Sequence, residues 1–208
     1  MMNNFIFENK TKVYFGKGGV KEYLGGLLAN FGETVMLAYG GGSIKCNGVY
    51  DEIMGILNAQ GKCVVEFSGI MSNPTYQKVQ EGAKLARENH VDLILAVGGG
   101  SVSDCCKVIS AQANLDEDIW EMLYAKHTLP TKFIPLGTIV TVFGTGSEMN
   151  NGAVITNEEK KIKGALWGAQ AEFAFLDPAY SLSVPMQQVI SGAFDTLSHA
   201  METYFGKP

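Results

Sequence analysis

Short, wholly apolar runs alternate with longer amphipathic stretches along most of this chain. Apolar runs of roughly four to eight residues are typical of buried strands, and an apolar repeat of about 3.6 residues is typical of helices. The apolar runs predict strands at residues 4–8, 12–15, 35–39, 63–67, 93–97 and 133–136, with a β-rich stretch over residues 153–176. The amphipathic stretches predict helices at residues 20–30, 49–59, 75–89, 102–112 and 186–205.

This alternation predicts an α/β fold, a Rossmann-like parallel sheet with helices on both faces. Strands that are apolar throughout are buried on both sides, as they are when a parallel sheet lies between two layers of helices. The alternation ends near Pro185, and the helix that follows has no strand after it. We therefore expect one domain over residues 1–185 and the first helix of a truncated all-helical domain over residues 186–208.

The composition excludes several classes of protein. With 46% hydrophobic and 18% charged residues among 208, the chain reads as a folded globular protein. The net charge of −5 and the scattered basic residues argue against a nucleic-acid or membrane partner. The N-terminus lacks the features of a signal peptide, and the apolar runs are too short to cross a bilayer, so we expect a cytoplasmic protein. The cysteines, at positions 46, 63, 105 and 106, fit no zinc pattern and are expected to be buried or unreactive thiols.

A glycine turn follows the predicted strand at residues 93–97 and is the first candidate binding element. It consists of Gly98, Gly99, Gly100 and Ser101, and it opens a helix. Glycines let a backbone approach a diphosphate closely, and the N–H groups and dipole of the helix favour negative charge. Ser101 is expected to cap this helix, with Asp104 completing a capping box. A tight turn that binds nothing remains the alternative, since neither the G-x-G-x-x-G fingerprint nor the P-loop pattern is present.

An earlier glycine turn, with Gly41, Gly42 and Ser43, ends the strand at residues 35–39 and is the first of the two along the chain; the turn at residues 98–101 is the second. An acidic residue at such a strand end usually binds the ribose 2′-hydroxyl of NAD(H). Here the turn itself carries no acid, and Lys45 lies just beyond it. If the turn binds a dinucleotide, NADP(H) is therefore preferred and NAD(H) is possible. A turn without a ligand is again the alternative.

Two further groups of residues carry candidate chemistry. Residues 138–148, rich in hydroxyls and glycine, read as a loop whose Thr138 and Thr141 could contact ribose and phosphate oxygens. Asp195 and His199 stand four positions apart on the last predicted helix, which puts a carboxylate and an imidazole on one face. Both are ordinary ligands of Fe²⁺ and Zn²⁺. Taken alone, the pair could equally be a hydrogen bond on a helix surface.

As a set, these motifs resemble those of the iron-containing (group III) alcohol dehydrogenases. Two early segments, residues 11–16 and 39–43, point to the branch of butanol dehydrogenases and NADPH-dependent aldehyde reductases. The segments that carry the resemblance occur in the family's order, at residues 98–104, 144–150, 176–178 and 192–199. One departure is internal, because Val142 and Phe143 stand where smaller or hydroxyl-bearing residues are common.

The resemblance implies a dinucleotide-binding domain followed by a helical domain, with a metal between them. Asp195 and His199 match the first two of the family's four metal ligands, an Asp and three His, and Lys161 matches a lysine near the nicotinamide ribose. The implied activity is hydride transfer between NAD(P)H and a primary alcohol or aldehyde such as butanol or butanal, with Fe²⁺ or Zn²⁺ as Lewis acid. The implied partner is a second copy in a homodimer. Family members are roughly twice as long, so we expect this chain to lack the other ligands.

Two other functions remain open at this point. The chain could be a truncated, catalytically inactive module that binds nucleotide. It could also be a relative of glycerol dehydrogenase or dehydroquinate synthase, which place related glycine turns on a similar scaffold. The spacing of Asp195 and His199 and the residues 146–148 favour the alcohol dehydrogenase branch over this last reading.

Overall fold

The structure, a computed structural model, describes residues 4, 6 and 8–206. Its centre is a six-stranded sheet in which every neighbouring pair of strands is parallel, as predicted. The strand order is β1-β8-β5-β4-β2-β3. The strands are β1 (Lys12–Phe15), β2 (Thr34–Tyr39), β3 (Cys63–Phe67), β4 (Leu93–Gly98), β5 (Leu136–Val140) and β8 (Phe173–Leu176).

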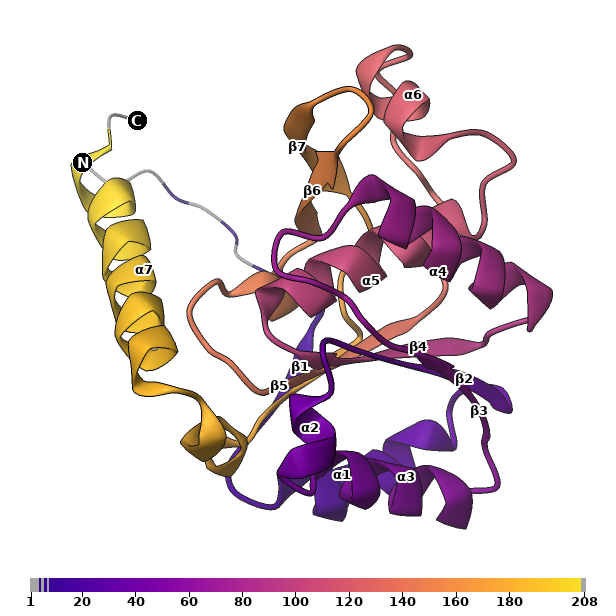
Figure 1. Ribbon diagram of the computed structural model, residues 1–208, viewed down its shortest axis with the longest axis vertical. Coiled ribbons are helices and arrows are strands. Elements are labelled where there is room, and N and C mark those ends of the chain that lie inside the picture. Colours follow the sequence, from indigo (N-terminus) through magenta and orange to yellow (C-terminus); the bar gives the residue numbers. More distant parts are fainter. Residues whose placement is uncertain (1–3, 5, 7, 207–208) are drawn as a thin grey trace.

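Helices cover both faces of this sheet (Figure 1). On one face lie α1 (Gly19–Leu28) and α3 (Val49–Ala59), and on the other lie α4 (Tyr76–Glu88) and α5 (Gly100–Gln112). The central strands show why both layers are needed. Val35 and Leu37 of β2 pack into the cluster with α1 and α3, whereas Met36 and Ala38 pack into the cluster with α4 and α5. Successive side chains of a strand point to opposite faces, so an apolar strand requires a core on each side.

Helix α5 is the most deeply placed helix of the domain. Ten of its thirteen residues are buried. It lies against α4, β4 and the antiparallel hairpin of β6 (Gly152–Asn157) and β7 (Ile162–Trp167). The predicted β-rich stretch over residues 153–176 thus contains this hairpin and β8. A side chain on any face of α5 therefore contacts another part of the protein.

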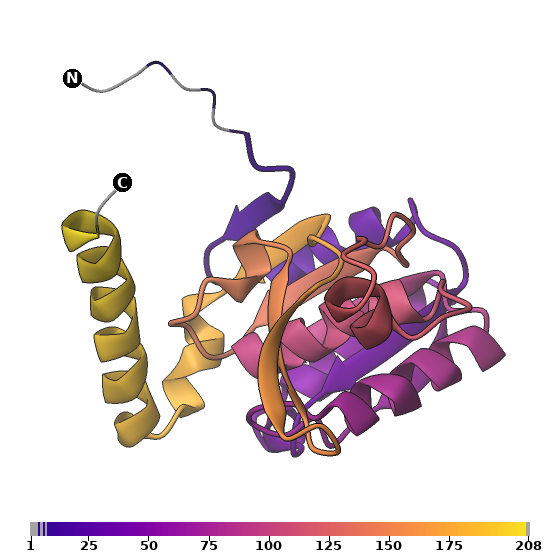
Figure 2. The same cartoon turned by 90° about the horizontal axis from the view of Figure 1, so that it is seen from above.

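The last helix, α7 (Met186–Phe205), extends away from the sheet domain (Figures 1 and 2). None of its twenty residues is buried. Its large apolar side chains, among them Phe194, Leu197 and Met201, are exposed. This helix has the predicted extent and has no strand after it within the described residues.

Several elements differ from the sequence predictions. The strand predicted at residues 133–136 is β5, and it lies at Leu136–Val140, so part of the predicted loop is strand. Helix α6 (Ile119–Tyr124), the short α2 (Ser43–Cys46) and the 3-10 turns η1 (Ser147–Met149) and η2 (Pro178–Ser183) were not predicted. Of the strand predicted at residues 4–8, residues 5 and 7 lie outside the described residues, and residues 4, 6 and 8 are not in a strand. Among the residues that are described, no helix combines the length and apolarity needed to cross a bilayer.

The cysteines divide into two pairs by exposure. Cys105 and Cys106 of α5 are buried, as expected, and burial raises the pKa of the Cys105 thiol to about 12. Cys46 and Cys63 are exposed, so they are not buried thiols, and that they are unreactive stays a prediction. All four are free thiols.

Candidate cofactor and metal site

The two glycine turns lie next to each other at the carboxyl edge of the sheet. Strands β2 and β4 are neighbours, and Tyr39 pairs with Val97 directly before the turns begin. The chain leaves β2 towards the α1–α3 layer and leaves β4 towards the α4–α5 layer (Figure 1). Such a divergence is a topological switch point, where open α/β sheets bind their ligands. Both predicted binding turns therefore occur where this fold makes a crevice.

The N-terminus of α5 opens into a cleft of about 600 Å³. Gly99 is the N-cap residue, and its carbonyl accepts hydrogen bonds from the N–H groups of Val102 and Ser103 at 3.0 and 3.2 Å. The N–H groups of Gly100 and Ser101 precede these bonds at the positive end of the helix. Both residues line the cleft. The prediction that Ser101 caps the helix is wrong, because the helix begins at Gly100, two residues before the predicted start, and its N-cap Gly99 makes no side-chain hydrogen bond.

Asp104, which was expected to complete that cap, instead joins α5 to the segment of residues 147–154 by hydrogen bonds. Its carboxylate accepts hydrogen bonds from the Ser147 hydroxyl at 2.5 Å and from the Val154 N–H at 2.9 Å. Asp104 also lines the cleft, so its predicted contact with a cofactor stays a prediction.

Lys107, one helical turn after Asp104, completes this attachment and was missed by the sequence analysis. Its side chain is fully buried, and its ammonium donates to Ser147 Oγ at 2.8 Å, Asn150 Oδ1 at 3.0 Å and the Gly152 carbonyl at 2.7 Å. Burial lowers the pKa of Lys107 to about 8, against the opposing effect of Asp104 at 3.8 Å. The available signal was a lysine between Cys106 and Val108 in a predicted helix, since a buried cation requires such partners.

A second pocket of about 290 Å³ lies beside the first glycine turn. It is lined by Tyr39, Gly40, Gly41, Gly42, Lys45, Ser68 and Gly69. Gly42 has φ +98° and is the N-cap of α2, whose first residue is the exposed Ser43. Gly41 has open space on its side-chain side, since an added Cβ would meet no atom within 4 Å. The turn is thus accessible to a ligand, as its predicted role requires.

The two threonines predicted near the cofactor differ in position. Thr138 lies inside β5, is fully buried, and its hydroxyl is directed at the Phe173 carbonyl at 3.5 Å. The prediction that it lines the cofactor surface is wrong, because the strand extends through it. Thr141 follows the strand end, and its N–H donates to the Gly98 carbonyl at 3.0 Å, which ties it to the second glycine turn.

The structure brings a different lysine to the cleft from the one that was predicted. Lys161 lies in the tight turn of the β6–β7 hairpin with φ +54°, is exposed, and is not among the residues that line the cleft. Lys163, two residues later on β7, lines it and donates to Asn73 Oδ1 at 2.7 Å. Lys163 is therefore the lysine that lines the cleft, and the role of Lys161 near the nicotinamide ribose stays a prediction.

Asp195 and His199 reach the same cleft from α7. Asp195 Oδ1 and His199 Nε2 are 3.7 Å apart, and both side chains are about half exposed. The two side chains share one face as predicted, and their donor atoms suit Fe²⁺ or Zn²⁺. Within residues 8–206 and the two described residues before them, no three His, Cys, Asp or Glu side chains gather as a metal site would require. The pair therefore fits part of a metal site.

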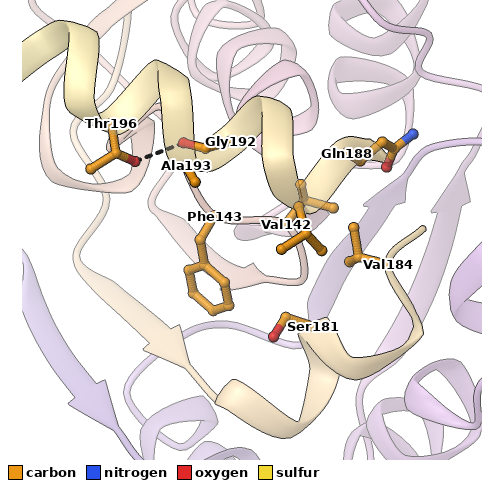
Figure 3. A pocket seen from close by; sticks show the side chains of 9 residues that line it. Val142, Phe143, Ser181, Val184, Gln188, Gly192, Ala193 and Thr196 are labelled. Atoms are coloured by element: carbon orange, nitrogen blue, oxygen red, sulfur yellow. Dashed lines mark hydrogen bonds between the residues drawn. The ribbon is translucent and has the colours of Figure 1, made fainter. Parts of the chain in front are cut away.

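Helix α7 meets the sheet domain through two glycines. The carbonyl of Phe143 would lie 2.6 Å from a Cβ added at Gly192, and the Cα of Gly192 would lie 3.2 Å from one added at Gly144. The Thr196 hydroxyl, which donates to the Gly192 carbonyl at 2.9 Å, also reaches the Gly144 carbonyl at 3.4 Å. A small, mainly apolar pocket of about 220 Å³ lies beside this contact, between α7 and Val142, Phe143, Ser181 and Val184 (Figure 3).

These features together describe an α/β domain in which the start of α5 and the pair Asp195 and His199 line one cleft. The family model for iron-containing alcohol dehydrogenases matches residues 10–178. The chain belongs to this family, as the resemblance in its motifs predicted.

Similar proteins include both NADH- and NADPH-dependent enzymes by name. The chain is 44% identical over 207 residues to the "Probable NADH-dependent butanol dehydrogenase 1" of Bacillus subtilis, covering 98% of this chain and 53% of that protein. It is 40% identical over 214 residues to the "NADPH-dependent aldehyde reductase YqhD" of Escherichia coli, covering 100% and 54%. The crystal structure of an NADH-dependent butanol dehydrogenase A from Thermotoga maritima matches with a TM-score of 0.91 and 39% identity, over 98% of this chain and 52% of that one. The chain thus spans about half the length of these relatives.

Proposed function

We propose that this chain is the nucleotide-binding part of an oxidoreductase that transfers hydride between NAD(P)H and a primary alcohol or aldehyde, such as butanol or butanal. The observation that carries the proposal is one shared cleft. The N-terminus of α5, at Gly100 and Ser101, and the pair Asp195 and His199 all line it. The names of the relatives, which refer to butanol dehydrogenases and an aldehyde reductase, support this substrate class.

In this proposal the residues of the second glycine turn, Gly98 to Ser101, bind the cofactor diphosphate. The free N–H groups at the helix start supply hydrogen bonds, and the helix dipole stabilises the negative charge. Thr141 helps to hold this turn through its bond to the Gly98 carbonyl. Asp104 and Lys107 hold the neighbouring loop against α5 through their hydrogen bonds with Ser147. Residues 1–185 would form the cofactor domain, and residues 186–208 would begin the metal domain.

Asp195 and His199 would hold Fe²⁺ or Zn²⁺. Such an ion, when bound, polarises the substrate oxygen and lowers the pKa of an alcohol. The carboxylate and the imidazole are held one helical turn apart, which orients both donor atoms towards the cleft before any ion binds.

The first glycine turn would select the cofactor, with NADP(H) preferred and NAD(H) possible. Gly41, Gly42 and Ser43 offer backbone and hydroxyl hydrogen bonds without a carboxylate, and Lys45 lines the adjoining pocket. A 2′-phosphate is stabilised by such a cation, whereas a carboxylate on the turn itself would repel it. Gly41 to Ser43 are therefore the residues proposed to bind the adenosine ribose.

A second candidate function is a module that binds nucleotide without turnover. It is suggested by the small number of potential metal ligands at the cleft. Among the described residues, no third potential ligand gathers with Asp195 and His199. Two ligands on one exposed helix hold a metal weakly. For the 208-residue chain by itself we therefore expect cofactor binding, less than one equivalent of metal, and essentially no aldehyde reduction.

Elemental analysis after chelator-free purification, a butanal assay with NADPH and NADH, and cofactor titration distinguish these functions. Cofactor binding without turnover supports the second candidate for the chain alone. One equivalent of iron or zinc with normal turnover would mean that the missing ligands come from elsewhere, for example a second chain. Absence of binding for both cofactors would refute both candidates. The homodimer and the cytoplasmic location expected from the sequence stay predictions, and size-exclusion chromatography with light scattering tests the first.

A further inference from the structure

Glu66 places a carboxylate next to the proposed 2′ pocket, although the glycine turn itself carries no acid. It lies on β3, the strand beside β2, with its backbone paired to Leu37. Its Oε2 accepts a hydrogen bond from the Tyr39 hydroxyl at 2.6 Å, and its Oε1 accepts one from the Tyr50 hydroxyl at 2.6 Å. These bonds, that of Tyr39 foremost, lower the pKa of Glu66, so its charge is present at neutral pH. The strand order thus brings to the turn an acid that lies more than twenty residues away in sequence.

The Glu66 carboxylate engages the one cation that lines this pocket. Lys45 Nζ lies 3.3 Å from Glu66 Oε2. The ammonium also lies 4.4 Å from the ring centre of Tyr50 and 5.3 Å from that of Tyr39. Lys45 is consequently held at the rim of the pocket by two aromatic rings and a carboxylate, and its charge is partly balanced before a ligand arrives.

We propose that Glu66 is a specificity-determining residue that acts through Lys45 and limits the preference for NADP(H). The inference rests on the proposed function, in which this pocket receives the 2′ end of the cofactor. A 2′-phosphate bound by Lys45 shares the ammonium with Glu66, whereas the 2′-hydroxyl of NAD(H) brings no charge to it. Two acceptors on one ammonium lie within about 6 Å of each other, twice a hydrogen-bond length. The carboxylate therefore opposes NADP(H) and leaves NAD(H) nearly unaffected.

The replacement Glu66→Gln tests this because it removes the charge and keeps one amide oxygen, which can accept a hydrogen bond from one of the two tyrosines. The repulsion between a phosphate and a carboxylate at this separation, in water and moderate salt, corresponds to about three- to tenfold in affinity. We expect the ratio of NADPH to NADH affinity to rise by that factor, and the rise to shrink in high salt. Lys45→Gln should lower the ratio. The measurement is fluorescence titration of both cofactors at two ionic strengths.

The matched control is Glu88→Gln, at the C-terminal end of α4. Glu88 is also an exposed glutamate beside a lysine, with Lys84 Nζ at 3.8 Å, but α4 ends at the opposite edge of the sheet. This variant should keep the parent's ratio. An unchanged ratio in Glu66→Gln, or an equal change in both variants, would overturn the inference while leaving the proposed function intact. A parent chain that binds neither cofactor would refute the proposed function and this inference with it.

Discussion

The buried ammonium of Lys107 gives a stability prediction that the structure makes quantitative. A tenfold change in proton affinity corresponds to about 1.4 kcal/mol. Lowering the pKa of Lys107 from its ordinary 10.5 to about 8 therefore means that the charge costs the folded state about 3 kcal/mol. Below pH 8 both the folded and the unfolded chain carry this proton, and the cost is fully present. Between pH 8 and 10.5 the unfolded chain binds more protons, so the contribution of this residue to stability rises with pH.

Lys107→Met removes the titrating group and also breaks its three hydrogen bonds. At pH 7.5 the loss of a charged partner by Ser147, Asn150 and the Gly152 carbonyl outweighs the relief of the cost of the buried charge, and we expect a net destabilisation of about 3 kcal/mol. The difference in unfolding free energy between parent and variant should widen by about 2 kcal/mol from pH 7.5 to pH 9.5. Urea unfolding at several pH values measures both quantities.

The control is Lys84→Met on the neighbouring helix. Lys84 is 72% exposed, so its removal should change stability little and should leave the pH dependence of the parent unaltered. Parallel pH profiles for the parent and Lys107→Met would refute the reasoning, because they would show that Lys107 titrates at the same pH in both states.

Three further substitutions test the turns and the helix contact. Gly41→Asp should shift cofactor preference towards NAD(H) by about tenfold, or 1.4 kcal/mol, because the new carboxylate accepts from a 2′-hydroxyl and repels a 2′-phosphate. The added Cβ would meet no atom within 4 Å, and equal titrations of parent and variant would contradict the prediction. Gly99→Val should weaken cofactor binding more than it lowers thermal stability, because its side chain blocks approach to the helix start; an unchanged dissociation constant would show that this turn does not touch the cofactor. Gly192→Ala should displace α7, since its Cβ would lie 2.6 Å from the Phe143 carbonyl. Faster hydrogen exchange at residues 142–145 than in the control Ser191→Ala checks this, and equal exchange would count against it.

The apolar strands and amphipathic helices of the sheet domain could be predicted because each obeys one local period. The error at β5 has a physical cause. Gly137 and Thr138 read as turn residues, yet a Cβ added at Gly137 would lie 2.2 Å from the Phe173 ring, and Thr138 lies wholly inside the core. Here glycine is required by close packing between strands, and a local pattern cannot distinguish that from a turn. Helix α6 was missed although its N-cap was readable, since Asp118 accepts from the N–H groups of Trp120 and Glu121.

At the candidate site, the sequence predicted the residues that directly follow strands. It did not predict the residues that only tertiary packing places there. Glu66 lies near the first turn only because β3 pairs with β2. No sequence spacing predicts the ion pair between Glu66 and Lys45. Lys163 rather than Lys161 lines the cleft because the hairpin turn holds Lys161 at its tip. Asp195 and His199 could be predicted to share a face because both stand on one helix. The residues of the sheet domain that lie near this pair could not be predicted.

The two walls of the cleft differ in how firmly the fold holds them. One wall is α5, whose start carries the glycine turn and whose next turn carries Asp104 and Lys107, bonded to the loop at Ser147. Because most of α5 is buried, the proposed cofactor surface is fixed by the same core that stabilises the domain. The other wall is α7, which has no buried residue and approaches the domain closely at Gly192. Cofactor binding should therefore depend on the stability of the sheet domain, whereas any metal held by Asp195 and His199 should depend on what keeps α7 in place.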